Sequence, residues 1–420
     1  MSLSASDRFR HSVSEALHKV PIIWMALIVF VAIQFITIPF AKAAIGTAFQ
    51  RALIEQVNWT CVFVVSAYIF QTPGRAEKYV GLLMALGVPI ILIAIPEAMQ
   101  EEVLWRNHVP SFLKVDDAVA QIILQASVRG ATGLYRAKAT FSTALGLSEF
   151  MALLVPFAIH YATNTYRLPV RIFGAAMIPI LFFVIRLTDS RLGLVGFLIS
   201  FLLYLLLWSM RRFRRNRRDL LAATVVYAYP AFFLASVGAV LTFHKLNVLV
   251  FGGGAQADSN EARKLQLVMG VPKILLNPLG HGPGMSGTAM GYGEGQFVTV
   301  DNYYLTAGLE YGVIGLACFF TMFLTAIGLG AKYAVQTAHR RDSEMYLLAP
   351  LAVALAEFLV IKSVFSQEDN HSLLFLFLGM TVALVARARE DLRREQEMAG
   401  SVTRPAPARR RLPSLASGAR

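Results

Sequence analysis

The residues best suited to chemistry lie in one glycine-rich stretch between residues 277 and 315, NPLGHGPGMSGTAMGYGEGQFVTVDNYYLTAGLEYGVIG. The stretch contains His281, Asp301 and Glu310, and each of these side chains can accept or orient the proton of an attacking hydroxyl group. Glycines let the backbone turn sharply or approach a ligand, and two prolines restrict the same loop. We therefore expect a shaped loop that presents Asp301 first, and then His281 and Glu310, as catalytic residues.

Three arginines are candidates for binding an anionic group. Arg136 lies just before an apolar run, Arg191 ends a polar turn between two apolar runs, and Arg263 follows the polar residues DSNEA. A guanidinium group is a planar fork of donors that matches phosphate oxygens. Other interpretations stay open, because Arg136 can anchor a helix at the membrane interface, Asp189 can neutralise an arginine of the turn, and Arg263 can lie on a solvated helix face.

The candidate bases also have simpler interpretations. His281, and His371 in the segment QEDNH, can be loop residues bonded to backbone or water, and Asp301 can cap a helix that begins near Tyr303. A metal site made from His281, Glu294, Asp301 or His371 lacks a ligand spacing such as HExxH. We predict no metal and no cofactor.

The composition indicates the class of protein that carries these residues. The chain has 420 residues, of which 56% are hydrophobic and 15% charged, and its mean hydropathy is +0.56. These values are typical of a polytopic membrane protein whose main partner is the lipid bilayer. The net charge of +13 comes from basic residues bunched beside apolar runs, which favours the positive-inside rule over nucleic-acid binding. Cys61 and Cys318 lie within apolar runs, so we expect neither a disulfide framework nor a cysteine metal cluster.

The apolar runs predict an all-α fold with about ten transmembrane helices. We expect spans near residues 22–41, 52–70, 79–95, 143–161, 170–186, 191–208, 220–243, 303–330, 346–363 and 372–387.

The basic segments 211–218 and 332–341 orient these spans. They are predicted to be cytoplasmic, which puts both termini in the cytoplasm and the long loops, about 97–142 and 244–302, in the periplasm. We accordingly divide the chain into an N-terminal segment (1–21), a transmembrane domain (22–387) and a basic cytoplasmic tail (388–420).

Several motifs together resemble a known family. YRAKATFS before a span, the turn LTDSRLGL, the segment around Arg263, NPLGHGPG and DNYYLTAGLEYGVIGL resemble, in order and spacing, the O-antigen ligase and polymerase superfamily of bacterial inner-membrane glycosyltransferases. The resemblance covers the region from about residue 120 to about residue 330. It implies C-type enzymes that take a glycan from an undecaprenyl diphosphate donor at the periplasmic face, without nucleotide sugar or metal. It also implies that Arg136, Arg191 and Arg263 bind the diphosphate.

One departure from the family pattern favours a polymerase. The pattern of the ligases that this segment resembles is His followed by Asn, Ser or Gln, then nine residues, and then Gly-x-x-Gly/Thr/Tyr. Here Asp301 and Asn302 precede nine residues and Gly312-Val-Ile-Gly315, so the spacing is kept but an aspartate replaces the histidine. We predict a polymerase for O-antigen, exopolysaccharide or capsule, with a chain-length regulator and a flippase of the same pathway as partners. The alternatives are a ligase that transfers glycan to lipid A–core and, in another class, a carrier or flippase, which the lack of an internal repeat disfavours.

Overall fold

The computed structural model describes residues 7–108, 124–128, 133–164, 167–251, 257–291, 300–338 and 342–402. Within these residues the chain is helical and forms no strands, only one isolated bridge between Val128 and Tyr135. The helices are α1 (Asp7–Lys19), α2 (Pro21–Ile36), α3 (Ile45–Glu55), α4 (Val62–Ile69), α5 (Arg75–Gln100), α7 (Ala144–Asn164), α8 (Leu168–Leu187), α9 (Arg191–Arg215), α10 (Leu220–Thr242), α11 (His244–Phe251), α12 (Ala257–Leu276), α13 (Ser286–Met290), α14 (Tyr303–Gln336), α15 (Leu348–Lys362) and α16 (His371–Val402).

Ten helical segments in the described part of the chain are long and apolar enough to cross a membrane. Two of them are composite, since a short helical stretch, η2 (Ile38–Ala44), extends α2, and the π-helical stretch η3 (Gln56–Cys61) joins α3 to α4. A segment of about 20 residues at 1.5 Å per residue covers roughly 30 Å of hydrocarbon. The predicted all-α fold with ten transmembrane helices is confirmed.

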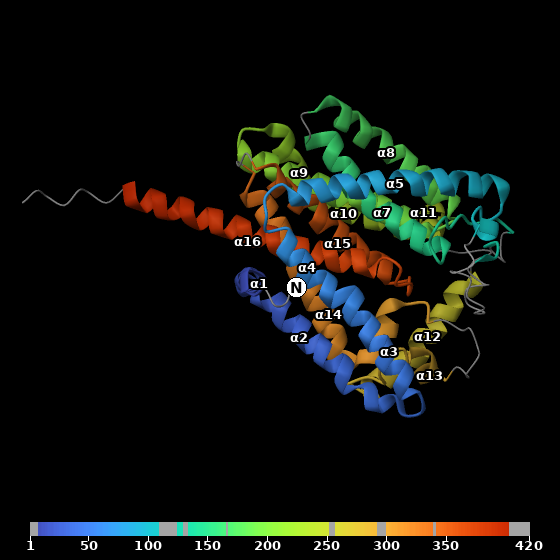
Figure 1. The fold of residues 1–420 in the computed structure, drawn as a ribbon. Coiled ribbons are helices and arrows are strands. Elements are labelled where there is room, and N and C mark those ends of the chain that lie inside the picture. Colours follow the sequence, from blue (N-terminus) through green and yellow to red (C-terminus); the bar gives the residue numbers. More distant parts are fainter. Residues whose placement is uncertain are drawn as a thin grey trace, which may run out of the picture.

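The core forms around α7, whose apolar segment is 94% buried within the protein. Helix α7 packs against α8, α9 and α15, while α2 packs on α14 and α4 on α16, as Figure 1 shows. Burying this helix on all sides explains why it carries no amphipathic stripe. Helix α10 is the opposite case, because only 6% of its apolar segment is buried within the protein. Most of its apolar surface is therefore left for lipid.

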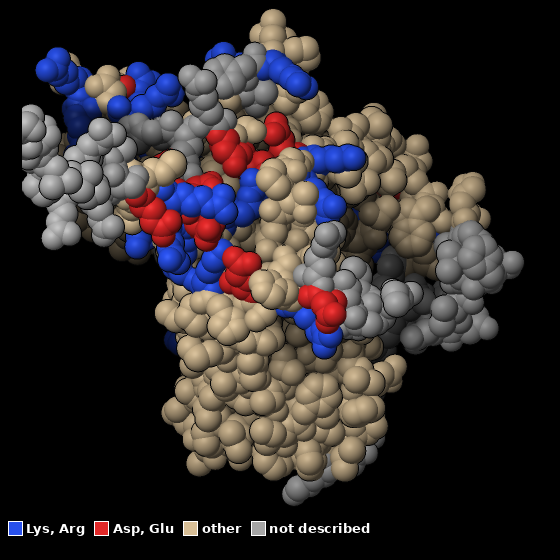
Figure 2. Space-filling view, turned by 60° about the vertical axis from the view of Figure 1, so that its left-hand side comes forward, with Lys and Arg blue, Asp and Glu red and all other residues tan. Residues whose placement is uncertain are grey.

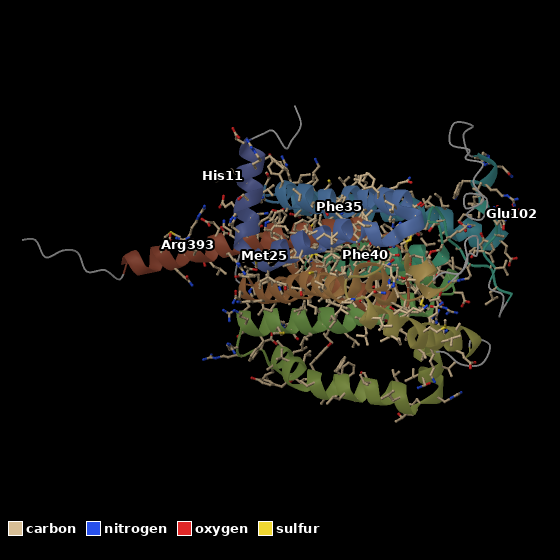
Figure 3. The ribbon with its side chains drawn as sticks, turned by 90° about the horizontal axis from the view of Figure 1, so that it is seen from below. His11, Met25, Phe35, Phe40, Glu102 and Arg393 are labelled. Atoms are coloured by element: carbon tan, nitrogen blue, oxygen red, sulfur yellow. The ribbon has the colours of Figure 1, made fainter. Side chains whose placement is uncertain are left out.

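The two ends of the helix bundle differ in chemistry. We call one the basic end; it comprises α1, the last turns of α9, the start of α10, the short helix η7 (Ser343–Leu347) and the second half of α16. The other, the loop end, comprises residues 36–56, 133–143, 186–191, 244–251, 257–291, 300–312 and 363–371. In Figure 3, His11 and Arg393 lie towards the basic end and Glu102 at the opposite end. Blue and red side chains gather where the basic end is turned forward, beside a mostly tan body (Figure 2).

Ion pairs tie the helices together at the basic end. Arg387 on α16 lies 3.1 Å from Asp342 and 2.6 Å from Glu344, and Glu344 also accepts a bond of 2.8 Å from the backbone N–H of Ala76 at the start of α5. Helix α16 continues to Val402, so the predicted tail begins as a helix, and its remainder from 403 lies outside the described residues.

Candidate functional site

The loop end is organised around a break in helix α14. Gly312 adopts φ 67° and ψ −173° inside the helix, so the carbonyls before it lack regular helical partners. The glycine-rich loop supplies them: the backbone N–H of His281 donates to Leu309 O (2.8 Å) and that of Gly282 to Glu310 O (3.0 Å). The loop NPLGHGPG and the helix GLEYGVIG therefore form one structural unit.

Two glycines make this junction sterically feasible. A Cβ atom on Gly312 would lie 2.0 Å from the carbonyl oxygen of Pro278, and one on Gly280 would lie 2.3 Å from that of Glu310. Both glycines also have positive φ, which other residues rarely adopt. No larger residue fits at either position without moving the backbone.

The imidazole of His281 belongs to the same junction. Its Nδ1 lies 2.9 Å from Leu309 O and its Nε2 lies 2.8 Å from the amide nitrogen of Asn277. A carbonyl only accepts, so Nδ1 carries the proton and Nε2 accepts from Asn277. His281 can act as a base only if the bond to Asn277 is first exchanged for one to the substrate.

Asp301 is held by helix α12. Its backbone N–H donates to Gln266 Oε1 (3.0 Å), and its carboxylate lies 3.5 Å from Nε of Arg263, one turn earlier on α12, with the two side chains 34% and 29% exposed. This partial exposure leaves both groups within reach of a ligand. Helix α12 begins at Ala257, which places Arg263 in its second turn.

The neighbouring Asn302 caps helix α14. Its Oδ1 accepts from the backbone N–H groups of Tyr304 (2.8 Å) and Leu305 (3.2 Å), and its Nδ2 donates to Ser363 O (2.6 Å). The capping role considered for Asp301 in the sequence is thus filled by Asn302, and the aspartate carboxylate faces α12 instead.

Arg136 and Arg191 lie at the turn between α8 and α9. Nε of Arg136 donates to Thr188 O (3.0 Å), and Arg191, the first residue of α9, donates to Val248 O of α11 (3.4 Å). Asp189 in the same turn has φ 46°. The predicted arginines thus form two groups at the loop end, Arg136 with Arg191 at this turn and Arg263 with Asp301 beside α12.

A buried polar network adjoins the break in α14. Glu55 on α3, 1% exposed, accepts from the hydroxyl of Tyr311 at 2.6 and 2.7 Å, from Gln34 Nε2 at 2.8 Å and from Arg51 Nε at 3.0 Å. Arg51 also forms an ion pair with Glu368. Burial raises the pKa of the Glu368 carboxyl, and the nearby charge of Arg51 opposes this rise. The network connects α2, α3, α14 and the 363–371 segment.

Glu310, the third predicted catalytic residue, lies beside this network. It is 4% exposed and lies close enough to Arg51 and to Glu55 to interact with their charges. A carboxylate in an apolar helix must be paired or face a cavity, and Glu310 lies near the charge of Arg51.

A second buried pair holds the segment before α16. Lys362 and Glu149 are 3.1 Å apart and 0% and 1% exposed, and Asn370 Nδ2 donates to the same Glu149 oxygen (3.1 Å) and to Gly146 O (2.9 Å). Because a lone buried charge is costly, each partner keeps the other in place. The segment is therefore a fixed part of the loop end.

His371, the alternative base, is enclosed by aromatic rings. Its imidazole lies 4.8 Å from the ring of Tyr303, 5.4 Å from Trp59 and 5.7 Å from Phe358, between centroids. The side chain is 1% exposed, and neither ring nitrogen has a hydrogen-bond partner among the described residues. A substrate hydroxyl has far better access to Asp301 than to this imidazole.

Comparison with known families identifies the region that holds most of these residues. Residues 175–320 match the family model described as O-Antigen ligase. This part of the chain is therefore similar to the O-antigen ligase family. The match confirms the resemblance to the O-antigen ligase and polymerase superfamily, whose members are membrane glycosyltransferase-like enzymes. A comparison with curated proteins gives no match.

The O-antigen ligase region contains Arg191, Arg263, His281, Asp301 and Glu310, and it ends just beyond the break in α14. Arg136 and the buried network residues Arg51, Glu55 and Glu368 come from outside it. Sequence reasoning missed these network residues, although Arg51 and Glu55 at i and i+4 within an apolar run are a usable signal for a buried pair. Glu294, considered as a metal ligand, lies outside the described residues.

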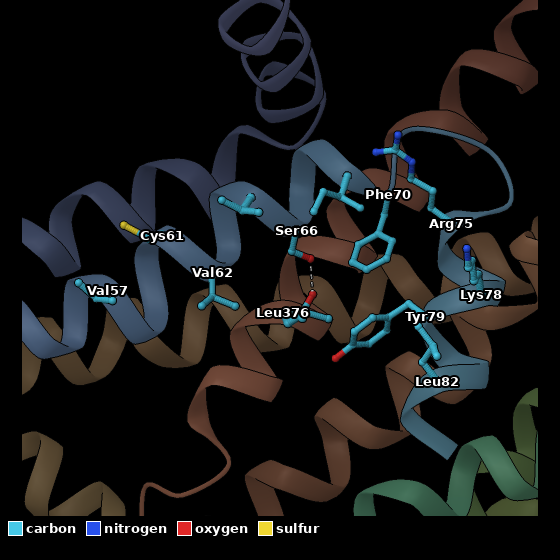
Figure 4. Close-up of a pocket in the computed structure, with 12 residues that line it drawn as sticks. Val57, Cys61, Val62, Ser66, Phe70, Arg75, Lys78, Tyr79, Leu82 and Leu376 are labelled. Carbon is cyan, nitrogen blue, oxygen red and sulfur yellow. Dashed lines mark hydrogen bonds between the residues drawn. The ribbon is translucent and has the colours of Figure 1, made fainter. Parts of the chain in front are cut away.

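The protein also has an apolar pocket of 610 Å³ between α4 and α5. Figure 4 shows Arg75 and Lys78 at one side of it, and Ser66 donating to Leu376 O, a bond of 2.6 Å. No histidine or carboxylate is among the described residues that line it.

Proposed function

We propose that this protein is a membrane glycosyltransferase that polymerises oligosaccharide repeat units linked to undecaprenyl diphosphate. The family match supports the membrane glycosyltransferase class. Residue 301 is an aspartate, whereas the ligase pattern that the segment resembles has histidine at this position. This difference supports a polymerase that makes O-antigen, exopolysaccharide or capsule.

The observation that carries the proposal is the pair of Arg263 and Asp301, 3.5 Å apart and both partly exposed. A diphosphate is the stronger ligand for a guanidinium, because it offers several anionic oxygens in one group. When the donor binds, Arg263 turns to the diphosphate and Asp301 is released to accept a proton. Pairing of Arg263 with Asp301 before the donor binds thus makes the carboxylate available as a base only when the donor is present.

In the reaction, the oxygen of an acceptor hydroxyl attacks the anomeric carbon of the donor. The bond between that carbon and the diphosphate oxygen breaks with its electron pair staying on the diphosphate, while the hydroxyl proton passes to the carboxylate of Asp301. Charge accumulates on the leaving diphosphate, and Arg136, Arg191 and Arg263 stabilise it in place of a metal ion. The products are undecaprenyl diphosphate and a lengthened lipid-linked glycan.

The proposed reaction site faces the periplasm of a bacterial inner membrane. The candidate residues all lie at the loop end, and the arginine cluster after α9 lies at the other end, which the positive-inside rule assigns to the cytoplasm. A flippase supplies the donor and a chain-length regulator sets the product length in this scheme.

Deleting the gene tests the assignment in cells. A polymerase mutant should carry surface glycan of a single repeat unit, because transfer to the surface continues without elongation. Accumulation of full-length lipid-linked polymer would instead assign a ligase, and an unchanged polysaccharide would contradict both assignments.

A further inference from the structure

A polar cavity lies at the basic end, between the last turns of α7 and α9, the start of α8, and η7. It has a volume of 610 Å³, within the range of about 300–1,000 Å³ typical of small-molecule sites. Among the described residues, four arginines line it, namely Arg171, Arg211, Arg212 and Arg215, together with Tyr346 and one carboxylate, Asp219.

Among the described residues that line this cavity, positive charges outnumber negative ones. Asp219 bonds Arg212 and also caps α10 by accepting from the backbone N–H of Ala222 (3.1 Å). The carboxylate of Asp219 therefore already neutralises Arg212. The other three lining arginines have no ion-pair partner in the part of the chain that the structure describes.

Arg211 forms the inner wall. It is 8% exposed, its guanidinium carbon lies 4.4 Å from the centroid of the Tyr346 ring, and its buried Nε has no hydrogen-bond partner among the described residues. A buried, unpartnered donor on a charged group is costly and calls for an acceptor. The stacking on Tyr346 fixes the plane of the guanidinium and so its remaining donors.

This cavity is separate from the candidate transfer site. Helix α9 has 25 residues, with Arg191 at its first position and Arg211, Arg212 and Arg215 in its last turns. At about 1.5 Å per residue the helix places roughly 36 Å between its two ends. The cavity therefore opens at the opposite membrane surface, where Figure 2 shows charged side chains gathered.

We propose that this arginine cavity binds a phosphate group, carried by an anionic phospholipid headgroup of that leaflet or present as free phosphate. Arginine presents paired donors that match phosphate oxygens, and basic pockets between transmembrane helices on the cytoplasmic side are suited to anionic headgroups. The bound phosphate supplies the acceptor that Nε of Arg211 lacks, and it joins α8, α9 and η7 through one anion.

Thermal unfolding of the purified full-length protein in detergent, with added phosphatidylglycerol, phosphatidylcholine or inorganic phosphate, tests this proposal. We expect phosphatidylglycerol to raise the melting temperature saturably and phosphatidylcholine to leave it unchanged. A similar rise with inorganic phosphate would identify the bare anion as sufficient, whereas a rise with phosphatidylglycerol alone would identify the lipid headgroup.

Matched variants separate the cavity from general surface charge. Arg211→Gln, and the double variant Arg171→Gln/Arg215→Gln at the exposed rim, should each weaken the apparent affinity by about tenfold or more, as expected for lost charged hydrogen bonds. Arg214→Gln and Arg218→Gln remove the same charge at exposed positions outside the lining and should bind as wild type. The rim variant leaves the buried arginine intact, so it remains informative if Arg211→Gln does not fold.

Two results would overturn the proposal. One is an absence of stabilisation by both phosphatidylglycerol and phosphate. The other is an equal response of the rim variant, the control variants and the wild type.

Discussion

At the scale of single residues, two adjacent side chains have separate tasks. Asn302 caps α14, whereas Asp301 pairs with Arg263. An Asp-Asn pair before an apolar run predicts a cap without saying which residue provides it, because Asp and Asn cap about equally well. Only the contact with α12, from a distant part of the sequence, distinguishes them.

Asp301→Asn should reduce turnover by ~10²–10⁴-fold, because the amide keeps the size of the carboxylate but cannot accept the proton. The fold should persist, since the cap is elsewhere. The measurement is elongation of a lipid-linked oligosaccharide at matched protein levels. Asn302→Ala is the control for capping and should lower stability by about 0.5–2 kcal/mol. Near-wild-type turnover of Asp301→Asn would remove Asp301 as the base and direct attention to His281.

At the scale of elements, the sequence predicted the helices much better than their junctions. The ten spans follow from apolar runs of sufficient length, which is a local property. The break in α14 depends instead on Gly312 adopting φ 67° and on carbonyl acceptors reached by a loop some 30 residues earlier. A glycine inside an apolar run is compatible with an unbroken helix, so this junction was not predictable.

Gly312→Ala tests whether the junction matters. The new Cβ would lie 2.0 Å from Pro278 O, and the positive φ alone costs about 1–3 kcal/mol for a residue other than glycine. The melting temperature in detergent should fall and glycan transfer should be lost. Gly328→Ala, on the same helix with no atom within 4 Å of the added Cβ, should be neutral or stabilising. Equal melting temperatures for the two variants would show that the break contributes nothing.

At the scale of the whole molecule, the account depends on which compartment the loop end faces. If all ten candidate spans of the described residues cross the membrane, both termini lie on one side, and the basic segments predict that this side is cytoplasmic. Reporter fusions after Arg218 and after Arg341 should report the cytoplasm, and fusions near Lys114 and Gly284 the periplasm. A cytoplasmic signal at Gly284 would put the candidate site on the wrong side of the membrane for a polymerase.

The most direct test of the central claim is glycan transfer by the purified protein. The full-length protein in detergent is mixed with a purified undecaprenyl-diphosphate-linked repeat unit, and the products are sized on a gel. We predict a ladder of lengthened lipid-linked glycans for the wild type and its loss in Arg191→Ala and Arg263→Ala, with poor rescue by lysine because an ammonium lacks the paired donors of arginine. A wild-type protein that leaves the single repeat unit unchanged, or alanine variants that make the full ladder, would contradict the account.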